Sequence, residues 1–141
     1  MPTRWILALA VAALVAVPLP ARAGIVFDEA SSGDLSDSGL SPTPLAFGPG
    51  SNAVSGTTGR DETAVDRDYF SFTLEPGYVF LSLVELAGTT TVGAVSFIAL
   101  EAGPQVTVPT DTPDASGLLG WSHYATADAD IDLLPEIGAS G

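Results

Sequence analysis

The chain has 141 residues, no cysteine and no lysine, and its formal net charge at pH 7 is −13. The lack of cysteine excludes a disulfide framework, a zinc–thiolate site and a thiol nucleophile. Nucleic acids and anionic membranes are bound through lysine and arginine side chains that neutralise phosphates, so a chain this acidic repels both. The composition therefore predicts a domain whose partners are neither nucleic acid nor anionic lipid.

Residues 1–23 have the pattern of a cleavable secretory signal peptide. Arg4 supplies the positive start, residues 6–17 are all apolar, and an Ala-x-Ala cleavage site ends at Ala23. The apolar run is shorter than the ~20 residues that a helix needs to cross a bilayer. We therefore expect an exported mature chain, residues 24–141, without a membrane span, located in the periplasm, at the cell surface or outside the cell.

Removal of this leader makes the chain still more acidic. It takes away Arg4 and Arg22, so that Arg60 and Arg67 alone oppose 17 acidic residues and the formal net charge becomes −15. A charge of this size keeps a protein soluble and attracts divalent cations loosely.

Glycine and proline interrupt the mature chain at short intervals, and the apolar runs between them are typical of β-strands. Residues 68–74 alternate apolar and polar side chains, which predicts a half-buried strand. Residues 75–77 predict a tight turn, and residues 79–86 the buried partner strand of a hairpin. Further strands are expected at residues 25–27, 45–47, 53–57, 92–100 and 105–108. Helical turns are expected only within residues 115–119 and 125–134.

Short strands with turn residues between them, and no sustained helical period, predict an all-β fold. The architecture that suits this pattern is a single antiparallel β-sandwich, or jelly-roll-like domain, over residues 24–141. The sequence contains neither an internal repeat nor a low-complexity linker that would divide it further.

The stretch DRDYFSFTLEPGY, residues 66–78, resembles a strand and turn of bacterial pre-peptidase C-terminal (PPC)-like β-sandwich domains. It is similar in particular to exported PEP-CTERM sorting-type proteins. Supporting stretches follow one another in the expected order, at residues 29–36, 96–103, 118–124 and 132–138. The resemblance implies a β-sandwich of the bacterial envelope or extracellular matrix.

Proteins of this type typically continue with closing strands and a Pro-Glu-Pro sorting tail. This sequence ends at Gly141, and its Pro135-Glu136 is followed by isoleucine. The resemblance therefore implies a domain that is incomplete at its C-terminus. We expect an uncovered sheet edge and a loosely packed end after Leu134, because an open edge recruits other chains.

Asp128, Asp130 and Asp132 are the candidate metal ligands. Aspartates at alternate positions can face one side of the chain, and calcium takes six to eight hard oxygen ligands. An EF-hand is excluded because Leu133 occupies a position that requires glycine. A second acidic group contains Asp61, Glu62, Asp66 and Asp68. The alternative for both groups is a solvated acidic surface.

His123 is the only histidine, and the sequence lacks G-x-S-x-G, H-E-x-x-H and P-loop patterns. Ser122 and His123 should point to opposite faces of a strand, which disfavours a catalytic pair. We expect His123 to be a packing residue. Trp121 and Tyr124, with Tyr69 and Tyr78, could form a flat aromatic platform for sugars; the alternative is that they close the core.

These features predict an exported, non-enzymatic structural or binding module of the bacterial envelope or extracellular matrix. Its partners would be extracellular polysaccharide or envelope proteins, and the exopolysaccharide contact follows from the resemblance alone. The alternatives are a secreted carboxylate-dependent hydrolase and a calcium-stabilised accessory domain. Two carboxylates facing one pocket would favour the hydrolase, and oxygens converging on one point would favour calcium.

Overall fold

Short strands dominate the part of the chain that the computed structural model describes, namely residues 24–60, 65–90, 95–125 and 130–140. The prediction of a β-rich fold is thus confirmed. None of the helices in these ranges combines the length and apolar character that a bilayer crossing requires. In chain order the elements are β1 (Gly24–Asp28), α1 (Glu29–Ser32), β2 (Thr43–Pro44), β3 (Asn52–Ser55), β4 (Gly59–Arg60), β5 (Val65–Asp66), β6 (Phe70–Ser71), β7 (Ser96–Leu100), β8 (Gly120–Tyr124) and α2 (Leu134–Ser140).

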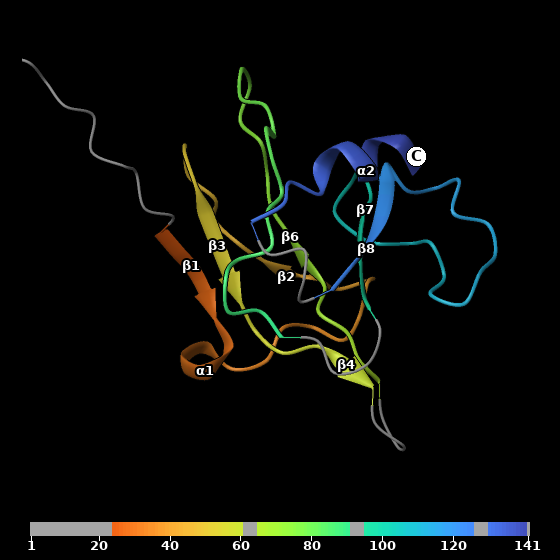
Figure 1. The fold of residues 1–141 in the computed structure, drawn as a ribbon, viewed down its shortest axis with the longest axis horizontal. Coiled ribbons are helices and arrows are strands. Elements are labelled where there is room, and N and C mark those ends of the chain that lie inside the picture. Colours follow the sequence, from red (N-terminus) through yellow and green to blue (C-terminus); the bar gives the residue numbers. More distant parts are fainter. Residues whose placement is uncertain (1–23, 61–64, 91–94, 126–129, 141) are drawn as a thin grey trace, which may run out of the picture.

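The described strands pair two by two. β1 pairs with β3 and β2 with β6 in parallel, whereas the pairs β4–β5 and β7–β8 are antiparallel. β1 and β3 lie on one side of the molecule, and β7 and β8 lie beside α2 on the other (Figure 1). These strands do not make up one antiparallel sandwich. Parallel pairs need crossover connections, which a chain of simple hairpins does not supply.

The hairpin expected between residues 68–74 and 79–86 forms only its turn. The amide of Tyr78 donates to the carbonyl of Glu75 at 3.0 Å, and Gly77 adopts a φ of 91°, a conformation that favours glycine. The segments on either side do not pair with each other: β6 pairs with β2, and residues 79–86 contain no strand, only a single bridge from Val84 to Asp132. The expectation of a buried central strand there is wrong.

Backbone groups after this turn bond to a late segment of the chain instead. The amide of Leu83 donates to Oδ1 of Asp132 at 2.9 Å, and its carbonyl accepts from the amide of Leu133 at 2.8 Å. The carbonyl of Glu85 accepts from the amide of Asp130 at 2.9 Å. These long-range bonds use the groups that a hairpin ladder would have needed.

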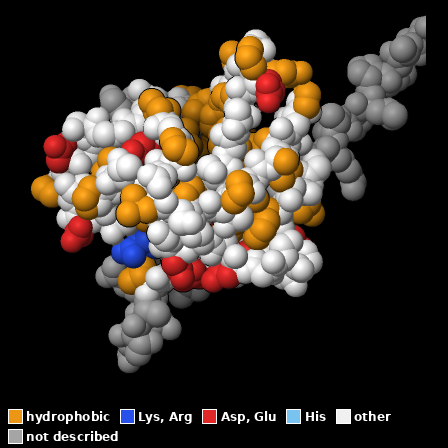
Figure 2. Space-filling model, turned by 180° about the vertical axis from the view of Figure 1, so that it is seen from behind, with side chains coloured by type: hydrophobic (Ala, Val, Ile, Leu, Met, Phe, Trp, Pro, Cys, Tyr) orange, Lys and Arg blue, Asp and Glu red, His pale blue; other side chains and the backbone are white. Residues whose placement is uncertain are grey.

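Residues 74–82 project from the body of the molecule, and we call them the apolar finger (Figure 1, green). Val79 and Leu81 are 70% and 80% exposed, and Leu74 and Tyr78 are exposed as well. Figure 2 shows apolar side chains gathered on this projection. A run of apolar residues that sequence reasoning assigned to the core thus lies on the surface.

Other expected strands have mixed outcomes. Residues 25–27 fall on β1, and residues 53–55 fall on β3, which ends before residues 56–57. Residues 96–100 form β7, while 92–94 lie outside the described residues. Residues 45–47 and 105–108 form no strand. In residues 105–108, the backbone amides that a strand would use bond to a carboxylate instead. Glu101 accepts from the amides of Thr107 and Val108 at 2.8 and 3.2 Å.

Residues 45–47 pack through a side chain rather than through a ladder. The ring of Phe47 stacks on that of Phe72, with centroids 4.5 Å apart, and Phe72 also contacts Phe80 at 5.7 Å. Of the two expected helical turns, residues 115–119 contain a turn closed by the amide of Leu118 and the carbonyl of Ala115. In the second range, residues 126–129 lie outside the described residues, and α2 begins only at Leu134. The expectation that helical turns occur only in these two ranges is wrong, because α1 and most of α2 lie outside them.

Residues 134–140 form helix α2, which corrects the expectation of a loose end after Leu134. Leu133 and Ile137 are spaced four residues apart and are both buried, Ile137 to 1% exposure. Oδ1 of Asp132 accepts from the amide of Leu134, the first residue of α2. Gly120 on β8 closely approaches the carbonyl of Ile137, so no larger residue fits there. The burial of Leu133 and Ile137 and this close approach hold the segment against β8.

Candidate functional site

The antiparallel pair β7–β8 places three rings on one of its faces. Its register sets Phe97 opposite His123 and Ala99 opposite Trp121. Side chains directly opposite each other share a face, and so do alternate residues of a strand. Phe97, Trp121 and His123 therefore gather on a single face around the small Ala99, and we call these three rings the aromatic platform.

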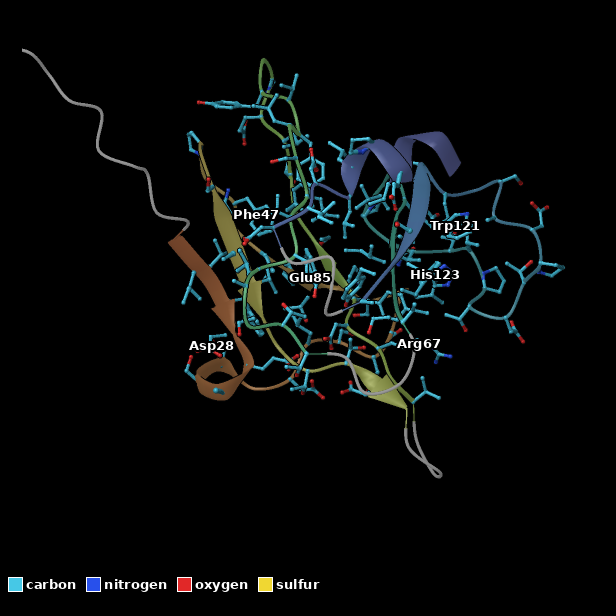
Figure 3. The ribbon with its side chains drawn as sticks, in the orientation of Figure 1. Asp28, Phe47, Arg67, Glu85, Trp121 and His123 are labelled. Carbon is cyan, nitrogen blue, oxygen red and sulfur yellow. The ribbon has the colours of Figure 1, made fainter. Side chains whose placement is uncertain are left out.

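The rings of the platform touch one another. Phe97 and Trp121 stack, with centroids 6.0 Å apart and ring planes inclined by 29°. His123 stands edge-on to both, with centroid distances of 5.5 Å. The side chain of Phe97 is 54% exposed, and His123 is exposed too. Trp121 and His123 lie on β8 in Figure 3.

The opposite face of β8 is turned toward α2. Ser122 is buried, and its hydroxyl donates to Oε2 of Glu136 at 2.9 Å. Gly120, two residues earlier, makes the close approach to Ile137 described above. Helix α2 therefore covers one face of the pair and leaves the aromatic platform on the other.

Sequence reasoning found part of this platform. Trp121 belongs to it, but Tyr124 follows at an odd spacing and so lies on the other face of β8. Tyr69 forms an isolated antiparallel β-bridge with Ser36, and Tyr78 lies in the turn of the apolar finger, so neither is on the β7–β8 pair. The partner that was missed is Phe97, since the register of β7 against β8 has no signal in either strand alone.

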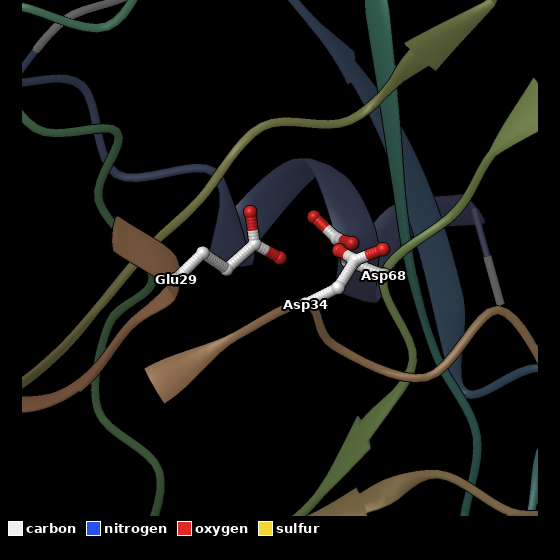
Figure 4. A group of neighbouring side chains, drawn as sticks. All are labelled: Glu29, Asp34 and Asp68. Carbon is white, nitrogen blue, oxygen red and sulfur yellow. The ribbon is translucent and has the colours of Figure 1, made fainter. Parts of the chain in front are cut away.

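A cluster of three carboxylates lies elsewhere, where α1 meets the chain that leads into β6 (Figure 4). Glu29 is the first residue of α1, Asp34 follows that helix, and Asp68 precedes β6. One oxygen of each lies within 4.8 Å of the others. Asp28 caps α1 by accepting from the amide of Ala30, which sets the position of Glu29.

Glu29 anchors the cluster to its surroundings. Its carboxylate accepts from the amide of Thr57 at 2.7 Å and from the amide of Leu35 at 3.1 Å. A side chain at Gly56 would lie 2.6 Å from its Cδ, so glycine is what lets β3 end so close. Burial raises the pKa of Glu29, but the hydrogen bonds from Thr57, Leu35 and Asp34 outweigh burial and lower it overall.

The pKa of Asp68 is shifted in the opposite direction. Burial, and then the negative charges of Glu29, Asp66 and Asp34, raise the pKa of Asp68 to about 7. Within the described structure, its buried Oδ1 has no hydrogen-bond partner. Burial and the charges of Asp66 and Glu29 also raise the pKa of Asp34. The cluster is therefore suited to share a proton at neutral pH, or to be neutralised by a hard cation.

Two of the three metal ligands expected from the sequence, Asp130 and Asp132, lie among the described residues. Asp128 lies outside these residues. Oδ1 of Asp132 accepts from the amides of Leu83 and Leu134, a structural role, and Asp130 is exposed with a φ of 67°. Of the second acidic group, Asp61 and Glu62 also lie outside, and Asp68 alone joins the carboxylate cluster. The sequence pattern did not indicate Glu29 and Asp34 because they lie more than 30 residues before Asp68 in the chain.

No catalytic arrangement appears among the described residues. Ser122 and His123 face opposite sides of β8, as the sequence predicts, and Ser122 bonds to Glu136 rather than to an imidazole. A hollow of about 330 Å³ contains no carboxylate and no histidine; it is lined by Pro44, Leu45, Ser71, Phe72, Thr73, Gly103 and Pro104. This hollow does not place two carboxylates as glycoside hydrolysis requires.

Comparison with protein-family models, with curated proteins and with solved structures gives no match for this chain. The resemblance to PPC-like and PEP-CTERM proteins therefore stays a prediction. Function has to be argued from the residues themselves.

Proposed function

We propose that this chain is an exported, non-enzymatic binding module of the bacterial envelope or extracellular matrix, and that it contacts exopolysaccharide through the aromatic platform. The observation that supports this function is the contact between the exposed ring of Phe97 and the half-buried ring of Trp121, whose planes are inclined by 29°. Large rings normally bury their area, so rings gathered on an uncovered sheet face indicate a binding surface. The leader pattern supports export.

The physical basis is the complementarity between an aromatic face and a sugar ring. One face of a pyranose presents mainly C–H groups, which carry partial positive charge, and the face of an aromatic ring is negative. Sugars therefore stack on aromatic faces, while their hydroxyls point outward to water or to neighbouring polar groups. The imidazole of His123 supplies such a polar group beside both rings.

Affinity electrophoresis of the mature chain tests this function. Neutral polymers, namely hydroxyethyl cellulose, dextran and galactomannan, are cast into native gels, and retardation is compared between variants. We expect at least one polymer to retard the wild type, and Trp121→Ala and Phe97→Ala to lose most of that retardation. Tyr78→Ala removes another exposed ring, on the apolar finger, and should leave it unchanged. Equal loss with all three variants, or no retardation by any polymer, would refute the proposal.

A second candidate function is that of a calcium-stabilised accessory domain. The buried Oδ1 of Asp68, with Glu29 and Asp34 nearby, favours it. If each of the three carboxylates gives one oxygen, they supply fewer than the six to eight that calcium takes, and backbone carbonyls or water would have to complete the shell. Asp128, Asp130 and Asp132 remain the ligand set predicted from the sequence. The complete β-sandwich likewise remains a prediction.

A further inference from the structure

We infer that the aromatic platform discriminates by charge, accepting uncharged polysaccharide chains and rejecting chains that carry carboxylates, with Glu101 as the residue that sets this preference. The inference rests on the proposed function, since it concerns the substrate class of the same surface.

Glu101 follows directly on the strand that carries Phe97. Trp121 lies opposite Ala99, so the diagonal neighbours of Trp121 on the other strand are Phe97 and residue 101. Glu101 is the first residue after β7, two positions beyond Ala99. A chain of sugars that lies across Phe97 and Trp121 therefore passes beside the Glu101 end of the strand.

Three hydrogen bonds hold the carboxylate of Glu101. Its carboxylate accepts from the hydroxyl and the amide of Thr107 at 2.6 and 2.8 Å, and from the amide of Val108 at 3.2 Å. The hydrogen bond from the Thr107 hydroxyl, together with those from the two amides, lowers the pKa of Glu101 despite its partial burial. The side chain therefore remains ionised at any physiological pH and cannot turn away from an approaching anion.

The whole molecule is also strongly acidic. The mature chain, without residues 1–23, would carry a formal net charge of −15, with only two arginines. Repulsion between this field and a polyanion slows their encounter, and like charges brought together at a binding surface also weaken the complex. The rings themselves have no preference of this kind, because every pyranose has a C–H face. Selection against acidic polymers then depends on the carboxylates, and locally on Glu101.

A matched pair of polymers isolates charge from sugar identity. Whichever neutral polymer binds the mature wild type is compared with its own carboxymethyl derivative, for example dextran with carboxymethyl dextran. We expect the carboxymethyl form to bind about tenfold more weakly at low salt, and the difference to shrink in 0.5 M NaCl, where the Debye length is only about 4 Å.

The variant Glu101→Gln should narrow this difference by several-fold, while its affinity for the neutral polymer stays within about twofold of the wild type. Glu75→Gln makes the same change of charge on the exposed turn of the apolar finger, so it reports the effect of net charge alone. An unchanged circular dichroism spectrum and melting temperature establish that each variant is folded. If Glu101→Gln unfolds, Thr107→Val serves instead, because it frees the carboxylate from its hydroxyl partner and should change the ratio between the two polymers.

The outcomes separate the two proposals. Equal binding of the neutral and carboxymethyl polymers, or equal effects of Glu101→Gln and Glu75→Gln, overturns the inference and leaves the binding function standing. Failure of every neutral polymer to bind overturns the proposed function and this inference with it. Binding of the carboxymethyl form alone overturns the inference in the opposite direction.

Discussion

The hydroxyl of Ser122 on β8 donates a hydrogen bond of 2.9 Å to Oε2 of Glu136 on α2. This contact and the burial of Ile137 hold the helix against one face of β8, and strand alternation then sends Trp121 and His123 to the other face. The way the last helix packs therefore decides which rings of the β7–β8 pair are available to a ligand.

Truncation of Ile137 tests whether this helix is part of the core. Ile137→Ala should lower the free energy of unfolding by about 2–5 kcal/mol, because it removes a fully buried side chain and leaves a cavity. Ile131→Ala makes the same change at an exposed position and should cost well under 1 kcal/mol. Urea unfolding measures both. Equal effects would show that the segment after Leu134 does not contribute to stability.

The raised pKa of Asp68 predicts an unusual dependence of stability on pH. The folded-state pKa of about 7 lies above the ordinary value of 3.8, so the folded protein binds the extra proton. Stability from this group is complete below about pH 4 and is lost as pH rises through 7. A shift of about three units corresponds to at most about 4 kcal/mol, which solvent screening at this partly exposed site reduces to about 1–2 kcal/mol.

Melting temperatures between pH 5 and 8 measure this effect. The carboxyls of Glu29, Glu101 and Asp114 have lowered pKa values, so their contributions are lost only as pH falls below about 4, outside this window. We expect the wild type to melt several degrees lower at pH 8 than at pH 5. Asp68→Asn should remove most of this slope, and Asp111→Asn, an exposed control, should retain it. An unchanged slope in Asp68→Asn would contradict the assignment.

Calcium addition discriminates between the two acidic groups. Selective binding to the folded state raises the melting temperature, so millimolar calcium should stabilise the mature chain at pH 8. If the ion lies at Glu29, Asp34 and Asp68, then Asp68→Asn removes most of the rise. A loss with Asp130→Asn instead places the ion at the ligand set predicted from the sequence. An equal rise with magnesium, or none with calcium, would indicate only screening of the net charge.

The apolar finger should make the purified protein prone to associate. The side chains of Val79 and Leu81 are 70% and 80% exposed. Exposed apolar patches attract hydrophobic dyes and other chains. Leu81→Ser should reduce dye fluorescence and concentration-dependent sedimentation without lowering the melting temperature. Leu40→Ser, at another exposed leucine, is the control. A large loss of stability in Leu81→Ser would mean that this side chain is packed rather than exposed.

Processing of the leader can be measured directly by the intact mass of exported material. We expect the mature species to begin at Gly24 or Ile25, because Ala21 and Ala23 suit a signal peptidase. A mature species that still contains Trp5 would refute the signal peptide.

The sequence by itself determined the local features of this protein. Proline and glycine at residues 76 and 77 specify the turn that forms there, and the short apolar runs correctly indicate a β-rich fold with strands at residues 25–27 and 96–100. These features depend on φ preferences and on side-chain alternation within a few residues, and both are readable along the chain. Composition alone likewise excludes thiol chemistry.

The tertiary structure alone decided which segments pair. The run at residues 79–86 is apolar enough for a central strand, yet Leu83 bonds to Asp132 and leaves Leu81 in solvent. Phe97 joins Trp121, and Glu29 joins Asp68, across separations that no local pattern encodes. The identity of an apolar or acidic residue does not specify which distant residue it will contact. The pairing is settled by the competition among backbone donors and by the burial that each arrangement allows.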